Sequence, residues 1–222
     1  MCRLTSINPV ILAWEYPPRI IGDMAHHLES LTSGLSKAKI PVCVVTCHNS
    51  PYSHEKRSDL LDVYWASNPV EPHISIITWC LALNSEVERI VSDIFYERHG
   101  KIDLLDIHDW HFVSAGTSLK KALGIPFVFT LHSLEDQRSL DPLSPLSSCI
   151  RGLERMGVNE SDLVITDSDS IKEEIMRIHE IPSDKIIVIP SSEPRWIREI
   201  IKSYSKTTSK PRRVRICSPP VF

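Results

Sequence analysis

The sequence is poor in glycine, with 7 in 222 residues. Glycine lets a backbone approach a phosphate closely, so a protein with several glycine-rich phosphate loops is not expected. Basic residues do not predominate either, because the formal net charge is −3. The overall charge therefore gives no reason to expect a nucleic-acid partner.

The six cysteines lack the spacing of a zinc knuckle or a redox motif, since none forms a C-x-x-C pair. Cys43 and Cys80 lie in apolar runs and are expected to be buried thiols, with no disulfide framework. No apolar run approaches the roughly 18 residues of a membrane-spanning helix. The opening MCRLTSINPV lacks the apolar core of a signal peptide. We therefore expect a cytoplasmic protein without membrane contact.

Charge is uneven along the chain. Residues 202–222 hold six basic side chains and no acidic one. We expect a domain over residues 1–200 and a basic tail over 201–222. Such a tail can bind RNA or acidic lipid, but more often it is a solvated end of the chain.

Short apolar runs alternate with segments of helical periodicity. The apolar runs predict strands at 9–14, 41–46, 60–66, 102–107, 126–131, 162–167 and 185–190. The periodic segments predict helices at 24–35, 74–99, 112–123, 149–159, 170–180 and 195–204. Ser170 and Glu173 have the spacing of a capping box. This alternation predicts an α/β fold, a Rossmann-like doubly wound parallel sheet with helices on both faces.

Ligands of open parallel sheets bind beyond the carboxyl ends of the strands. That rule selects four loops, EYPPRIIGD at 15–23, HDWH at 108–111, HSLEDQRS at 132–139 and SDS at 168–170. The first three are rich in histidine, acidic, arginine and aromatic residues. If the strands are parallel, these side chains converge on one edge of the sheet.

The HDWH loop has three interpretations. Asp109 and Trp110 suit a sugar, because a carboxylate accepts hydrogen bonds from hydroxyls and an indole stacks on a sugar ring. The structural alternative makes Asp109 a helix N-cap and Trp110 a core residue. A metal interpretation, with His108, Asp109 and His111 as ligands, rests on spacing alone.

His132 directly follows an apolar run, where it can donate a hydrogen bond to a hydroxyl or stabilise developing charge. Glu135 and Arg138 can pair with each other, or Arg138 can bind a carboxylate or phosphate. The alternative is a structural histidine beside a surface ion pair. His26 and His27 point about 100° apart on a helix, so only one can face the ligand, and we assign that place to His27.

Taken in order, these segments resemble the N-terminal half of the two-domain GT-B glycosyltransferases, above all the archaeal-type glycogen and starch synthases. WEYPPRIIGD resembles the family motif W-E-[FY]-P-P-x-x-G-G, DIHDW resembles H-x-H-D-W, and TLHSLEDQR resembles T-x-H-S-T-E-x-x-R. VITDSDSIKEE resembles V-I-T-x-S-x-x-x-K-E-E, and DKIIVIPSS resembles D-K-I-x-V-I-P-N-G. The resemblance covers roughly residues 10–190.

This resemblance implies transfer of a hexosyl unit, with retention, from a nucleotide sugar to a glycan hydroxyl. It implies neither a metal nor another cofactor. His132 would be the catalytic residue, in contact with the transferred sugar. The substrate-binding residues would be Gly22, Asp23, His27, Asp109, Trp110, Glu135 and Arg138. The helix after Gly22 would point its N-terminus at the donor diphosphate.

The sequence departs from the family pattern at several positions. Asp23 stands in place of the second glycine, where it would cap the helix and repel a diphosphate. The other departures are Ala25, Asp106, Leu134, Ser191 and Ser192.

The donor-binding second domain of the family has no counterpart in this sequence, so we expect the isolated chain to be poorly active. Its expected partners are a glycan acceptor, a nucleotide sugar, and either a separately encoded C-terminal domain or a second copy of the chain. The alternative function is a non-catalytic glycan-binding or regulatory remnant. A metal-dependent hydrolase ranks last.

Overall fold

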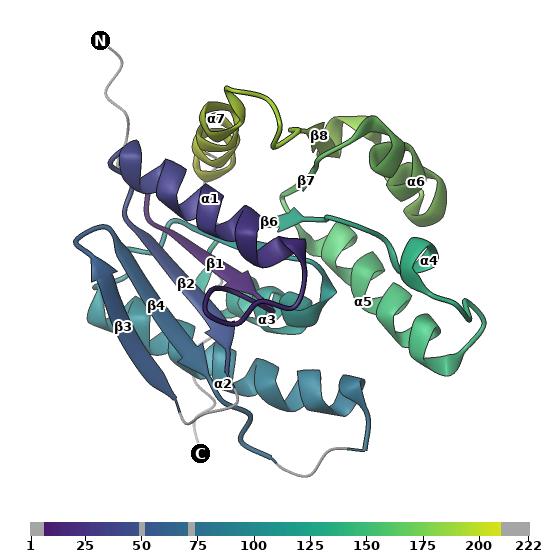
Figure 1. The fold of residues 1–222 in the computed structure, drawn as a ribbon, viewed down its shortest axis with the longest axis horizontal. Coiled ribbons are helices and arrows are strands. Elements are labelled where there is room, and N and C mark those ends of the chain that lie inside the picture. The colour runs from purple at the N-terminus through teal and green to yellow at the C-terminus, as the bar shows by residue number, and fades with distance from the viewer. Residues whose placement is uncertain (1–6, 49–51, 71–73, 210–222) are drawn as a thin grey trace, which may run out of the picture.

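A mostly parallel sheet of eight strands forms the middle layer of the protein (Figure 1). The computed structural model describes residues 7–48, 52–70 and 74–209. The strand order is β3-β4-β2-β1-β5-β6-β7-β8. The strands are β1 (Pro9–Ala13), β2 (Val42–Cys47), β3 (Ser53–Ser58), β4 (Leu61–Ala66), β5 (Leu104–His108), β6 (Phe127–Thr130), β7 (Leu163–Thr166) and β8 (Ile186–Val188).

Helices cover both faces of the sheet, which confirms the predicted doubly wound α/β fold (Figure 1). The α-helices are α1 (Asp23–Lys37), α2 (Ile76–Glu97), α3 (Val113–Leu123), α4 (Glu135–Arg138), α5 (Pro145–Glu160), α6 (Asp169–His179) and α7 (Trp196–Thr208). Short 3-10 helices occur at η1 (Trp110–Phe112) and η2 (Ser183–Lys185). None of these described helices combines the length and the apolar character needed to span a membrane.

The strands separate two apolar cores because successive side chains point to opposite faces. On one face, α1 and α7 pack against Ile11 and Val44. On the other face, α2, α3 and α5 pack against Leu12 and Val45. Burial on both faces explains why the central strands are continuous apolar runs that sequence periodicity detects.

The edge strand β3 has no counterpart among the predicted strands. Its sequence SHEKRS is polar and largely exposed, and it pairs antiparallel with β4. Charged side chains are common on edge strands, where they discourage pairing with another sheet. An edge strand of this kind lacks the apolar signal on which the prediction depended.

Three local features differ from the sequence-based expectation. The capping-box prediction was wrong, because Ser168 caps α6 through the backbone N–H of Ile171, and Ser170 lies inside the helix. The short helix α4 forms in a segment that carries no helical periodicity. Helix α7 continues through Thr208 and buries Tyr204, so the boundary placed at residue 200 falls inside a helix. Most of the basic tail, residues 210–222, lies outside the described residues.

Two glycines of α5 allow a direct test of this packing. A Cβ at Gly157 would lie 2.6 Å from the ring of Phe129 on β6, whereas a Cβ at Gly152 would have no neighbour within 4 Å. We expect Gly157→Ala to lower the free energy of unfolding by about 1–3 kcal/mol, because overpacking displaces the ring. Gly152→Ala should raise it by roughly 0.5–1 kcal/mol, because alanine favours a helix. Urea unfolding of the two variants checks the prediction, and changes of the same sign would contradict it.

Candidate functional site

A cleft of about 780 Å³ opens at the carboxyl edge of the sheet. The loops after β1, β5, β6, β7 and β8 contribute to its walls, together with the N-terminal parts of α1 and α7. The predicted convergence of these loops is therefore found. Its lining includes Glu15, Asp23, His27, Asp109, His132, Arg138, Asp167 and Trp196.

The loop after β1 contains a buried carboxylate that sequence analysis did not assign to the site. Glu15 is 4% exposed, and its Oε2 accepts hydrogen bonds from the backbone N–H groups of Ile21 and Gly22, the latter at 2.8 Å. Backbone N–H groups just before a helix are those that an anionic ligand would use. Here the chain's own carboxylate occupies two of them.

Asp23 is the first residue of α1, and it lies exposed at the cleft. The N-cap is Gly22, and no side chain caps this helix, so the expected capping role of Asp23 was wrong. Its negative charge nevertheless lies at the positive end of the helix dipole. The expected repulsion of a diphosphate therefore stays a prediction.

Asp109 ties the loop after β5 to the loop after β6. Its Oδ1 accepts a hydrogen bond from the backbone N–H of His132 at 2.9 Å, and its own N–H donates to the carbonyl of Thr130 at 3.0 Å. Asp109 has a φ of 55°, in the left-handed region that only a few residue types adopt readily. The turn that aims Asp109 into the cleft is thus maintained by its contacts with β6.

Trp110 does not line the cleft. It is 6% exposed and packs with Cys80 and Ile150, as the structural alternative foresaw, so its position gives no support to sugar stacking. The ring of His111 stacks on Trp110 at 4.0 Å and on Trp14 at 4.4 Å. His111 therefore packs against two aromatic rings. The metal interpretation of HDWH, which made His111 a ligand, was wrong on this point.

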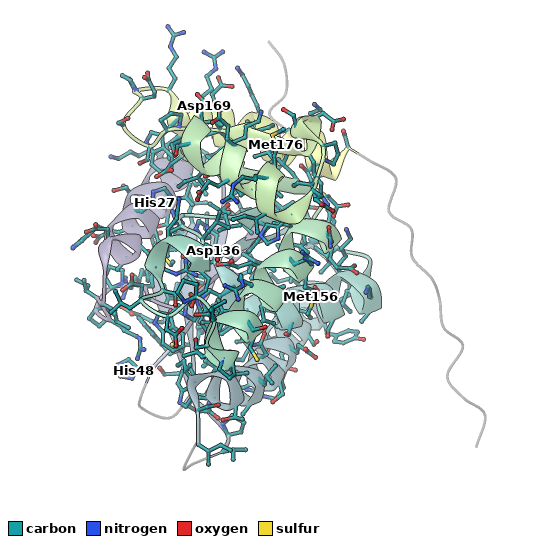
Figure 2. All side chains as sticks on the ribbon, turned by 90° about the vertical axis from the view of Figure 1, so that its right-hand side faces the viewer. His27, His48, Asp136, Met156, Asp169 and Met176 are labelled. Atoms are coloured by element: carbon teal, nitrogen blue, oxygen red, sulfur yellow. The ribbon has the colours of Figure 1, made fainter. Side chains whose placement is uncertain are left out.

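His132 lies in the cleft wall beside two other histidines. Its Nε2 is 2.9 Å from Nδ1 of His108, and its ring meets the ring of His27 edge-on at 4.7 Å. His27 lines the cleft from α1, the helix on which Figure 2 labels it. His26 lines the cleft as well, so the expectation that only one of the two can face the ligand was wrong. Burial lowers the pKa of His132 and, with the neighbouring histidines, lowers the pKa of His27 to about 3. Near neutral pH both rings are therefore uncharged.

Arg138 reaches the cleft from α4, where a buried glutamate holds it in place. Its Nη2 is 2.8 Å from Oε1 of Glu154 and 3.5 Å from Oε2 of Glu135, so the expected pair with Glu135 forms. Glu135 is buried, and its Oε1 accepts a hydrogen bond from Ser147 at 2.7 Å. Glu135 thus pairs with Arg138 from inside the protein and does not line the cleft.

Comparison with known proteins decides the family. The profile of Glycosyltransferase Family 4 matches residues 22–192. An uncharacterized glycosyltransferase of Methanocaldococcus jannaschii is 32% identical over 198 residues, which are 88% of this chain and 49% of that protein. The chain belongs to glycosyltransferase family 4. A glycogen synthase of Mycobacterium tuberculosis is 27% identical over 182 residues, which are 76% of this chain and 44% of that enzyme.

Solved structures of glycosyltransferases share this fold. Sucrose-phosphate synthase from Thermosynechococcus elongatus matches 83% of this chain and 48% of its own, with a TM-score of 0.69 at 14% identity. The catalytic domain of starch synthase IV from Arabidopsis thaliana, bound to ADP and acarbose, matches 90% of this chain and 50% of its own, with a TM-score of 0.51 at 12% identity. The chain spans about half the length of the relatives that it matches.

Asp106 stands where the motif of the resembled glycosyltransferases has a histidine, and it is completely buried. It accepts hydrogen bonds from Thr130 at 2.7 Å and from the hydroxyl of Tyr204, and its Oδ2 lies 3.3 Å from Nε2 of His108. Burial acts to raise the pKa of Asp106, but these three neighbours hold it below its ordinary value. A buried carboxylate thus lies beside His108, although it makes no hydrogen bond with Nε2 of that ring.

Several site residues were missed for a common reason. Glu154 and Trp196 lie in helical segments whose periodicity predicts only burial or exposure. Their partners are distant in sequence, since Glu154 contacts Arg138 and Trp196 packs against His27 at 5.2 Å between ring centroids. For Asp167, the rule on strand ends had selected the loop, and the structure places its side chain in the cleft wall.

Glu154 should make the stability of the protein depend on pH. Burial raises the pKa of Glu154 from 4.5 to about 7, despite the opposing effect of Arg138. The folded state therefore prefers the protonated form, and this contribution to stability is present below about pH 4.5 and is lost as pH rises through about 7. Glu154→Gln keeps a hydrogen-bond acceptor and removes the charge. Between pH 5 and pH 8 its free energy of unfolding should gain about 1–3 kcal/mol relative to wild type.

Urea unfolding at both pH values measures this difference. Glu199→Gln serves as the control, because Glu199 forms an exposed ion pair with Lys202 and should show little change. A constant difference between Glu154→Gln and wild type at the two pH values would contradict the prediction.

Proposed function

We propose that the chain is the acceptor-side domain of a hexosyltransferase of the glycogen or starch synthase type. It acts on a nucleotide sugar and a glycan, and the product keeps the anomeric configuration of the donor. The observation that carries this proposal is the cleft, where His132, Asp109 and Arg138 meet on a family 4 domain. The glycogen synthase relative and the starch synthase neighbour support the choice of glycan.

The reaction replaces one bond to the anomeric carbon by another. The bond from that carbon to the diphosphate oxygen breaks, a bond to an acceptor hydroxyl oxygen forms, and the hydroxyl proton leaves with the diphosphate. An uncharged His132 donates a hydrogen bond to a hydroxyl of the transferred sugar and stabilises charge as the bond breaks. Asp109 accepts from sugar hydroxyls, and Arg138 presents a cation to the leaving group.

A second domain completes the donor site in this proposal. The relatives extend over about twice the matched length, and closure of two domains around the donor would exclude water from the reaction. One observation favours the alternative of a non-catalytic glycan-binding module. The carboxylates of Glu15 and Asp23 both lie where a donor diphosphate would approach α1.

The test is transfer of labelled hexose from a panel of nucleotide sugars to glycogen. It uses the full chain together with any C-terminal domain encoded beside it. We expect His132→Ala to lower the transfer rate by about 100-fold or more, because it removes a donor aimed at developing charge. His99→Asn is the control. His99 is exposed, lies just after the C-terminal end of α2 and does not line the cleft. Asparagine tolerates its φ of 52°.

Binding to glycogen, measured in parallel by affinity electrophoresis, separates the two functions. Glycan binding without transfer from any donor would favour the binding module. Absence of both activities, or full transfer by His132→Ala, would contradict the proposed enzyme.

Removal of the charge at Asp23 should strengthen the binding of a diphosphate. One fewer negative charge at an exposed helix N-terminus is worth about 0.3–1 kcal/mol, or roughly a 2–5-fold gain in affinity. Isothermal titration of ADP and UDP into wild type and Asp23→Gly measures the gain. Asp59→Gly changes the net charge equally at an exposed turn between β3 and β4, away from the cleft, and should leave the affinity unchanged. Equal affinities of Asp23→Gly and wild type would show that Asp23 does not oppose the ligand.

A further inference from the structure

We propose that His27, His108 and His132 bind a divalent first-row transition metal ion, with Zn²⁺ as the best match. Each histidine offers one ring nitrogen, and the three nitrogens all lie within 4.8 Å of one another. In the described part of the chain, this is the one group of histidine, cysteine and acidic side chains close enough to hold such an ion. The ion would lie at the cleft wall, where His27 and His132 are exposed to the cavity.

The three ligands come from three separate elements of the fold. His27 lies on α1, His108 ends β5, and His132 follows β6. Neighbouring strands and a packed helix fix the spacing of these residues, so the ligands do not depend on one flexible loop. A site built on regular elements holds its geometry without large rearrangement.

The distance between His108 and His132 needs only a small adjustment to accept the ion. Nδ1 of His108 and Nε2 of His132 lie 2.9 Å apart, in a hydrogen bond that shares one proton. Zinc binds nitrogen at about 2.0–2.1 Å, so a tetrahedral site places two such nitrogens about 3.4 Å apart. The ion would take the place of the shared proton, and the rings would separate by about half an ångström.

Asp106 supplies the outer carboxylate that metal-bound histidines usually have. Its Oδ2 lies 3.3 Å from Nε2 of His108, and Thr130 and Tyr204 hold the carboxylate itself. When a metal ion displaces the proton from the inner nitrogen of His108, a carboxylate in this place can accept the N–H of the outer nitrogen. Nε2 of His108 is buried without a hydrogen-bond partner although this carboxylate lies near it, and that is a second observation, independent of the clustering, that points to an ion.

The ligand chemistry selects the class of metal. Imidazole nitrogen suits Zn²⁺ and its neighbours in the transition series, whereas Mg²⁺ and Ca²⁺ prefer oxygen. Neither ring nitrogen of His27 has a hydrogen-bond partner among the described residues, so binding breaks no contact of this ring. Three protein ligands would leave one position open toward the cleft, for water or an anionic group.

The ion would regulate the protein by occupying a residue of the proposed active site. A metal bound to His132 withdraws that ring from the transferred sugar, so Zn²⁺ should inhibit transfer. This consequence rests on the proposed function, whereas the binding of the metal does not.

The test titrates the metal-free chain with Co²⁺, whose visible absorption reports tetrahedral coordination, and then displaces it with Zn²⁺. We expect one ion per chain and at least a tenfold loss of affinity in His27→Ala. His26→Ala is the matched control, because His26 is the exposed neighbour of His27 on the same helix. This variant should bind the ion as tightly as wild type does. Thermal unfolding without metal shows whether His27→Ala is folded, and a folded variant should lose the rise in melting temperature that Zn²⁺ gives wild type.

The proposed site is refuted if Co²⁺ gives no tetrahedral spectrum, or if folded His27→Ala binds as tightly as wild type. Equal losses in His26→Ala and His27→Ala would also refute it. Transfer that persists with Zn²⁺ bound would overturn only the inhibition. Loss of the metal site would leave the transfer assay intact, so failure of this inference and failure of the proposed function are distinguishable.

Discussion

The buried carboxylate of Asp106 is the interaction on which the functional edge of the sheet depends. An ionised carboxylate in an apolar interior is costly unless hydrogen bonds and charges satisfy it. Thr130 on β6, Tyr204 on α7 and His108 on its own strand meet that need. Through these contacts Asp106 joins two strands and a helix.

The cleft follows from the sheet and from that anchor. Parallel strands bring their carboxyl ends to one edge, so loops distant in sequence share one space. Asp109 then links two of these loops through the backbone of His132, and Glu154 holds Arg138 at the opposite wall. His132 and Arg138 are thus each backed by a polar contact that is buried or partly buried. Such support keeps the site ordered before any ligand arrives.

The sequence predicts the parts of this structure that depend on local pattern. The central strands and most helices follow from apolar runs and periodicity, and the strand-end rule selects the loops that carry Asp109, His132 and Arg138 to the cleft. What the pattern misses depends on contacts between distant segments. The exposed strand β3 is defined by its pairing with β4, and the position of Trp110 in the core is decided by packing from α2 and α5. Similarly, Glu15 takes the place of an anion only because its loop folds back onto Gly22.

Helix α7 joins the outer wall of the cleft to the centre of the molecule. Its first residue, Trp196, lies against His27 in the cavity, and Tyr204, about two turns later, binds Asp106. Helix α7 cannot tilt freely, because a shift of its far end would move the Tyr204 hydroxyl away from the buried carboxylate of Asp106. The hydrogen bond between Tyr204 and Asp106 therefore opposes movement of the cleft wall that Trp196 forms.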